Sequence, residues 1–191
     1  MPQDCQDDDD YCNKYYHCSS NYNKRIKVSK PFKPVSYVAL RVAQKISLLI
    51  QLILPMYSVT DFTINELAVE RLLLCALTNA DPACVVRQEQ DFAIATAIVA
   101  MEYMERFIMQ FGFDLTTPPS ALFFQHLLCA CFLLAIKQLD DYMPCTVRWS
   151  KLNHLEVKET IHFEFLVCIT LDWKLVVFEH AFDVQYKSVM Y

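Results

Sequence analysis

Two charged residues stand inside long apolar stretches of the chain. Lys137 follows the run 121–136, which contains no charged residue, and Glu164 is the only charged residue in the run 160–171. A buried charge without a partner is strongly destabilising, so each side chain needs a counter-charge, a hydrogen-bonding partner or water. The two can pair with each other or lie at the rim of a core, and they can equally present hydrogen-bonding groups to another protein. The residues alone leave these alternatives open.

Other residues with reactive side chains form no recognisable site. Cys5, Cys12, His17 and Cys18 carry metal-binding groups, but their spacing matches none of the usual zinc patterns, which favours an unstructured segment with incidental thiols over a metal site. The chain has five scattered histidines and a single glycine, Gly112, so it offers no nucleophile elbow and no glycine-rich phosphate loop. We therefore predict no catalytic residue, no metal and no cofactor in a protein that is not an enzyme.

The composition predicts one helical domain in a reducing compartment. A length of 191 residues suffices for a single core, 54% of the residues are hydrophobic, and glycine for tight hairpin turns is nearly absent. The net charge is −5 and the basic residues are scattered among acidic ones, which argues against nucleic acid as a partner. The nine cysteines are an odd number, and several lie in apolar runs where reduced cysteine is a small hydrophobic residue.

Apolar periodicity near 3.6 residues indicates the helices that would carry these side chains. Residues 1–34 are acidic or polar, and we expect a mostly disordered tail there. A flanking helix should begin at Val35 and end at Pro55. Asn153, with Glu156 three positions later, should cap the last helix. Between these limits we expect five helices, with approximate bounds 63–78, 88–111, 119–137, 146–152 and 153–171.

The third of these five helices raises the question of a membrane. Residues 121–136 are apolar except for Gln125 and His126, and residues 46–57 are also rich in aliphatic side chains. Both runs are shorter than the ~20 residues that cross a bilayer. A helix that is apolar on every side is also what the centre of a helical domain requires, so we favour a buried core helix and expect no membrane contact.

Three segments near the ends of the predicted helices carry a family resemblance. Residues 103–107 read Tyr-Met-Glu-Arg-Phe, residues 133–137 read Leu-Leu-Ala-Ile-Lys, and residues 163–175 contain Phe-Glu-Phe-Leu followed by Leu-Asp-Trp-Lys-Leu. In their order and spacing these segments resemble the cyclin box, with Glu105 where aspartate is usual. The segment Trp-Ser-Lys-Leu at 149–152 is most similar to the P/U-type, phosphate-regulation-like cyclins, although an Asn-His pair follows where they have two glycines.

This resemblance, which covers about residues 63–176, implies the fold. It implies an all-α structure, with a cyclin-box five-helix domain and an extra N-terminal helix that together span residues 35–176. Residues 177–191 would be a C-terminal tail. In the family, an arginine of the first box helix pairs with the acidic residue of the second, which here implies a structural ion pair between Arg71 and Glu105.

The resemblance also implies a binding surface and a partner. The family residues that match Lys137 and Glu164 hydrogen-bond the main chain of a cyclin-dependent protein kinase, and those that match Cys168 and Leu175 give it apolar contacts. The implied function is a cell-cycle regulatory subunit that binds and activates such a kinase as a heterodimer in the nucleus and/or cytoplasm. Two alternatives are a cyclin-fold scaffold that binds a transcription or viral factor instead of a kinase, and a small membrane-associated helical protein.

Overall fold

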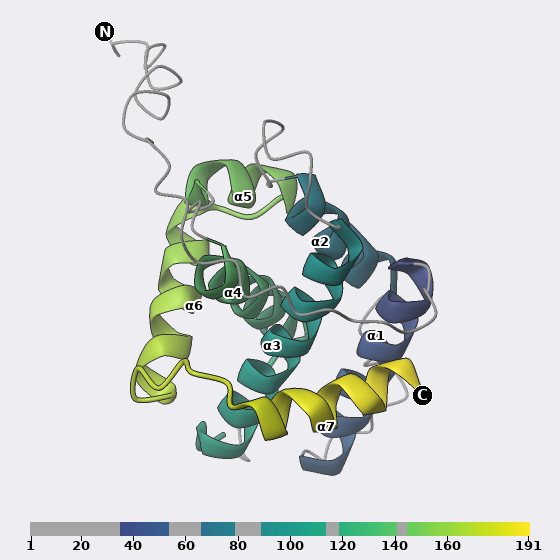
Figure 1. The fold of residues 1–191 in the computed structure, drawn as a ribbon. Coiled ribbons are helices and arrows are strands. Elements are labelled where there is room, and N and C mark those ends of the chain that lie inside the picture. The colour runs from purple at the N-terminus through teal and green to yellow at the C-terminus, as the bar shows by residue number, and fades with distance from the viewer. Residues whose placement is uncertain (1–34, 54–65, 79–88, 114–118, 141–144) are drawn as a thin grey trace, which may run out of the picture. The chain divides into compact units, whose positions relative to one another are not determined.

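The computed structural model describes residues 35–53, 66–78, 89–113, 119–140 and 145–191 (Figure 1). Within these ranges the chain is all-helical, with seven helices and no strand, which confirms the predicted all-α fold class. The five helices predicted between residues 63 and 171 are present as α2 to α6. The helices are α1 Val35–Ile53, α2 Glu66–Thr78, α3 Glu89–Gln110, α4 Ala121–Leu139, α5 Thr146–Leu152, α6 Val157–Thr170 and α7 Glu179–Met190.

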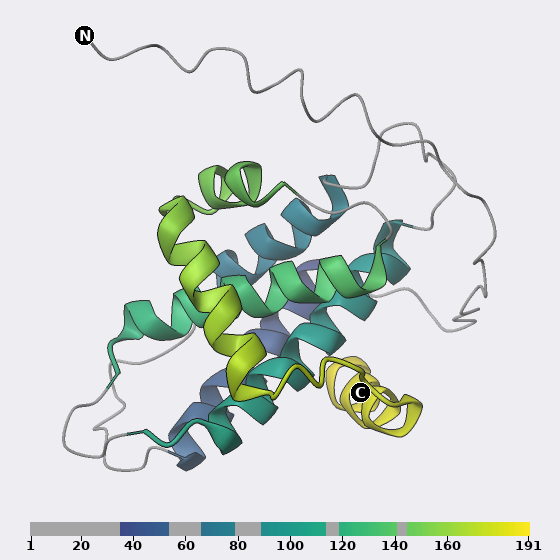
Figure 2. The same ribbon diagram turned by 90° about the vertical axis from the view of Figure 1, so that its left-hand side faces the viewer.

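Helix α4 forms the centre of the core. It begins after Ser120, whose hydroxyl accepts a hydrogen bond from the main-chain N–H of Phe123 at 3.2 Å, as an N-cap residue does. Eleven of its 19 residues are buried. Helix α3, which also buries eleven described residues, packs on one side of α4, and Figure 2 shows α6 crossing it on another. The expectation of a buried core helix at this position is therefore confirmed.

The long apolar sequence of α4 also bears on the question of a membrane span. Among the described residues, α4 is the one helix that is long and apolar enough to cross a membrane. However, 67% of the apolar stretch of this helix is buried against the rest of the chain. Burial of this kind is typical of the central helix of a packed helical domain, which must be apolar on nearly every side.

The C-terminal residues form a packed helix, so the predicted tail at 177–191 is wrong. Helix α7 lies against α3 and α1 (Figure 1). It buries Gln185, Tyr186, Val189 and Met190, which recur at helical spacing on one face. This face is short and flanked by charged residues, so the sequence resembles a solvated segment although its few apolar side chains complete the core.

The junction between α5 and α6 also differs from the prediction. The side chain of Asn153 donates to the carbonyl of Trp149 at 2.9 Å, so it closes the end of α5 instead of capping α6. Helix α6 begins after Glu156, whose side chain makes no capping hydrogen bond. The two helices are joined by the buried hydroxyls of Ser150 and Thr160, which are 2.8 Å apart. The predicted tail at 1–34 lies outside the described residues.

Candidate functional site

The two isolated charges of the sequence meet where α4 ends and α6 passes it. Lys137 lies in the last turn of α4, where a cation is favoured by the helix dipole, and its Nζ donates to Glu164 Oε1 in the middle of α6. The side chain of Lys137 is 21% exposed and that of Glu164 is 18% exposed. The pair is therefore partly desolvated but still accessible to solvent. Of the alternatives that the sequence left open, the structure shows the one in which Lys137 and Glu164 pair with each other.

The ion pair between Lys137 and Glu164 leaves hydrogen-bond donors and acceptors unused. A lysine ammonium has three N–H donors and a carboxylate has about four acceptor positions, of which the bond between Lys137 and Glu164 uses one each. No other hydrogen bond of these two groups occurs among the described residues. The remaining donors and acceptors are partly exposed to solvent and can bind the peptide groups of another chain.

Cys168 and Leu175, the predicted apolar neighbours, differ in exposure. Cys168 is one turn after Glu164 on α6, but it is only 5% exposed, so it offers less surface than expected. Burial, followed by the nearby carboxylate of Glu164, raises the pKa of its thiol, which therefore stays protonated and unreactive. Leu175 is partly exposed in the segment that follows α6.

The segment after α6 is held in an unusual main-chain conformation. Asp172 and Trp173 have φ values of 52° and 57°, in the left-handed region that bulky residues rarely adopt. Helix α3 fixes the residues that follow, because the hydroxyl of Tyr103 donates to the carbonyl of Leu175 at 2.7 Å and Arg106 donates to that of Lys174. Such conformations persist where the surrounding structure over-determines them, often at functional sites.

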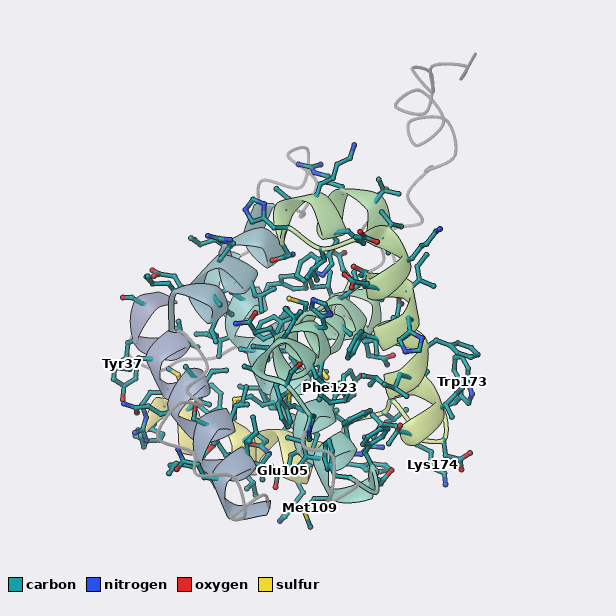
Figure 3. The ribbon with its side chains drawn as sticks, turned by 180° about the vertical axis from the view of Figure 1, so that it is seen from behind. Tyr37, Glu105, Met109, Phe123, Trp173 and Lys174 are labelled. Atoms are coloured by element: carbon teal, nitrogen blue, oxygen red, sulfur yellow. The ribbon has the colours of Figure 1, made fainter. Side chains whose placement is uncertain are left out.

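This turn presents an aromatic pair that the sequence analysis did not single out. Trp173 is 61% exposed and Phe165 is 55% exposed, and their rings meet edge to face with centroids 5.9 Å apart. Figure 3 shows Trp173 at the outer edge of the domain, pointing away from the helices. Aromatic side chains dominate many protein interfaces. The signal in the sequence was that Phe165 directly follows Glu164 and that Trp173 lies two positions before Leu175.

The predicted ion pair between Arg71 and Glu105 does not form, and this expectation is wrong. Arg71 is exposed on α2, whereas the Glu105 carboxylate on α3 accepts from the side chain of Gln185 on α7 at 2.6 Å. The ammonium of Lys45 donates to the same Gln185. Helix α7 therefore takes the place at Glu105 that the resemblance assigned to the arginine.

We expect replacement of Tyr103 with Phe to destabilise the domain by about 1 kcal/mol, because the carbonyl of Leu175 loses its donor. Burial raises the pKa of Tyr103, so the native hydroxyl stays neutral at a pH where an unfolded tyrosine ionises. Its contribution is complete below the unfolded pKa of about 10 and is lost as pH rises above it. Urea unfolding at about pH 8 and about pH 10.5 should therefore show a smaller alkaline loss of stability in Y103F than in the wild type. An equal loss in both proteins would contradict this role.

The described residues contain no group of three or more His, Cys, Asp or Glu side chains that could hold a metal ion. The candidate site consists of one ion pair, a turn with two residues in the left-handed region and exposed apolar side chains. In comparisons with known proteins, no family model, no curated protein and no solved structure matches this chain.

Proposed function

We propose that this protein is a cyclin-like regulatory subunit that binds and activates a cyclin-dependent protein kinase. The observation that carries the proposal is the partly exposed Lys137–Glu164 pair, which joins α4 to α6. In the cyclin box, which the sequence resembles, a lysine and a glutamate at these positions hydrogen-bond the kinase main chain. The order of helices and the unused donors and acceptors of the pair support the same proposal.

The proposed mechanism is selective binding to one conformation of the kinase. A ligand that contacts the active arrangement of a mobile kinase helix better than the inactive one shifts the population toward the active form. Lys137 and Glu164 would set the register of that helix through hydrogen bonds, because charged groups give orientation. Leu175 and the exposed aromatic pair would supply buried apolar area, and the kinase would carry out all the chemistry.

The test is coexpression of the tagged full-length chain with individual cyclin-dependent kinases. The expected result is a one-to-one complex that survives gel filtration and phosphorylates a general substrate far faster than the kinase alone. A stable complex without activation would instead favour the scaffold alternative, and no complex with any kinase would contradict the proposal. Cell fractionation tests the further expectation that the protein occurs in the nucleus and/or cytoplasm and not in membranes.

A further inference from the structure

Helix α6 carries a stripe of exposed apolar side chains, which we call the α6 stripe. It consists of Ile161, Phe165 and Ile169, spaced four residues apart on one face, and Trp173 beyond the helix end. Each of these four is between 53% and 61% exposed. Contiguous exposed apolar surface of this kind marks a site where another molecule binds.

The rest of the described structure leaves the α6 stripe uncovered. Helices α3, α4 and α5 contact α6, and its buried residues are Thr160, Val167 and Cys168, none of which belongs to the stripe. In Figure 2 this helix lies on the outside of the domain, facing the viewer. The apolar spacing of the stripe is that of a helix face that packs against a second helix.

The three helical residues of the stripe are spaced symmetrically about Phe165. Ile161 lies four positions before Phe165 and Ile169 four positions after it, while Lys158 lies seven before and Asp172, two residues beyond the last residue of α6, seven after. When two copies of such a helix pack antiparallel about a two-fold axis at Phe165, each Ile161 faces the partner's Ile169, and each Lys158 lies at the end of the partner helix that Asp172 follows. An isologous interface of this kind requires a surface that is complementary to itself.

The charges at the two ends of α6 satisfy that requirement. Lys158 is exposed in the first turn of α6, where a cation is disfavoured by the positive end of its own helix dipole. The Asp172 side chain, at the other end, is 78% exposed and pairs with the equally exposed Lys174. Antiparallel packing brings each Lys158 to the negative end of the partner helix and to its Asp172. We propose that two copies of this chain associate through their α6 stripes to form a two-fold symmetric dimer.

The exposed area of the α6 stripe gives an estimate of the affinity of the dimer. Each of its four side chains exposes roughly 100–150 Å², so one copy contributes about 400–600 Å², below the ~800 Å² per partner of a standard interface. The dimer is therefore weak and concentration-dependent, with a dissociation constant on the order of 10–100 µM. The inference does not rest on the proposed function. However, Phe165 and Trp173 are also assigned to the proposed kinase interface, so a chain that binds a second copy through its α6 stripe cannot contact a kinase with these two residues at the same time.

Sedimentation velocity of the purified chain from about 1 to about 200 µM tests the dimer, since this range spans the expected dissociation constant. The wild type should shift from monomer to dimer. F165D should stay monomeric throughout, because two carboxylates would meet at the symmetry axis. M109D is the matched control: Met109 is 70% exposed near the end of α3, outside the stripe, and this variant should dimerise like the wild type. Helical circular dichroism should be unchanged in both variants.

A charge exchange tests the antiparallel register. K158D and D172K should each weaken the dimer about three- to tenfold, because each variant creates two repulsive contacts per dimer. The double variant K158D/D172K restores both pairs and should regain wild-type association. A wild type that stays monomeric over the whole range overturns the proposal, and so does a double variant that dimerises no better than the single ones.

Discussion

Replacement of both Lys137 and Glu164 with alanine is expected to abolish binding of the proposed kinase while the fold survives. Truncating a buried interfacial charge typically costs ~2–5 kcal/mol, so losing two should weaken the complex by several orders of magnitude. In the free chain the two side chains pair with each other and keep about a fifth of their exposure. Removing both leaves no unpaired charge behind, so stability should change by about 1 kcal/mol or less. Copurification and thermal melting measure the two effects.

The reversed pair K137E/E164K separates binding from packing more sharply. It keeps an ion pair between α4 and α6 but exchanges donor and acceptor, so the chain should stay folded and still lose the kinase. The control variant K151A/E156A removes two exposed charges around the α5–α6 junction and should bind normally. If the double alanine variant unfolds, Lys137 and Glu164 are internal supports of the core. If it stays folded and retains the kinase, the proposed interface is wrong.

The sequence was sufficient to predict the helices whose apolar patterns are long and regular. Helix α4 is the clearest case, because its 121–136 run has no charged residue and its burial follows directly. The sequence also indicated that Lys137 and Glu164 need partners, because each charge stands alone on an apolar helix. A mutual ion pair was one of the alternatives that this pattern left open.

The features that were not predicted depend on contacts between residues far apart in the chain. Gln185 and Glu105 are 80 residues apart, and no local pattern links them, so α7 resembled a polar tail and Glu105 was assigned to Arg71. The left-handed turn at Trp173 likewise needs Tyr103 and Arg106 of α3 to hold the segment that follows. Local propensity opposes a bulky residue in that conformation, and tertiary contacts override it.

The polar cluster beneath α7 gives the largest expected effect on stability. Gln185 is 4% exposed; its amide oxygen accepts from Lys45, and its amide nitrogen donates to Glu105 at 2.6 Å and to Glu102 at 3.2 Å. Burial lowers the pKa of Lys45, and the two carboxylates oppose that shift. Gln185 thus distributes hydrogen bonds among one cation and two anions that are half-buried, and Lys45 makes one further hydrogen bond, to Ser188 Oγ at 2.7 Å.

Replacement of Gln185 with Leu should therefore destabilise the domain by about 2–4 kcal/mol, because charged groups are left without their hydrogen bonds. For a chain of this size the expected fall in Tm is roughly 5–15 °C. Q125L is the matched control, since Gln125 is exposed on α4 and its replacement should shift Tm little.

The pH dependence of stability in the Q185E variant tests the same polar cluster. It places a third carboxylate at a buried position beside Glu102 and Glu105. We expect burial and the repulsion of two carboxylates to outweigh the attraction of the single Lys45 ammonium, which raises the pKa of the new group above its unfolded value of about 4.3. A group with a raised native pKa destabilises the fold where it is ionised, so the defect of Q185E should be largest near pH 7 and shrink as pH falls toward about 5. Urea unfolding at both pH values measures this. If Q185L and Q185E both have the Tm of the wild type, the polar cluster does not hold α7 against the domain. The apolar contacts of Tyr186, Val189 and Met190 would then be sufficient to hold it.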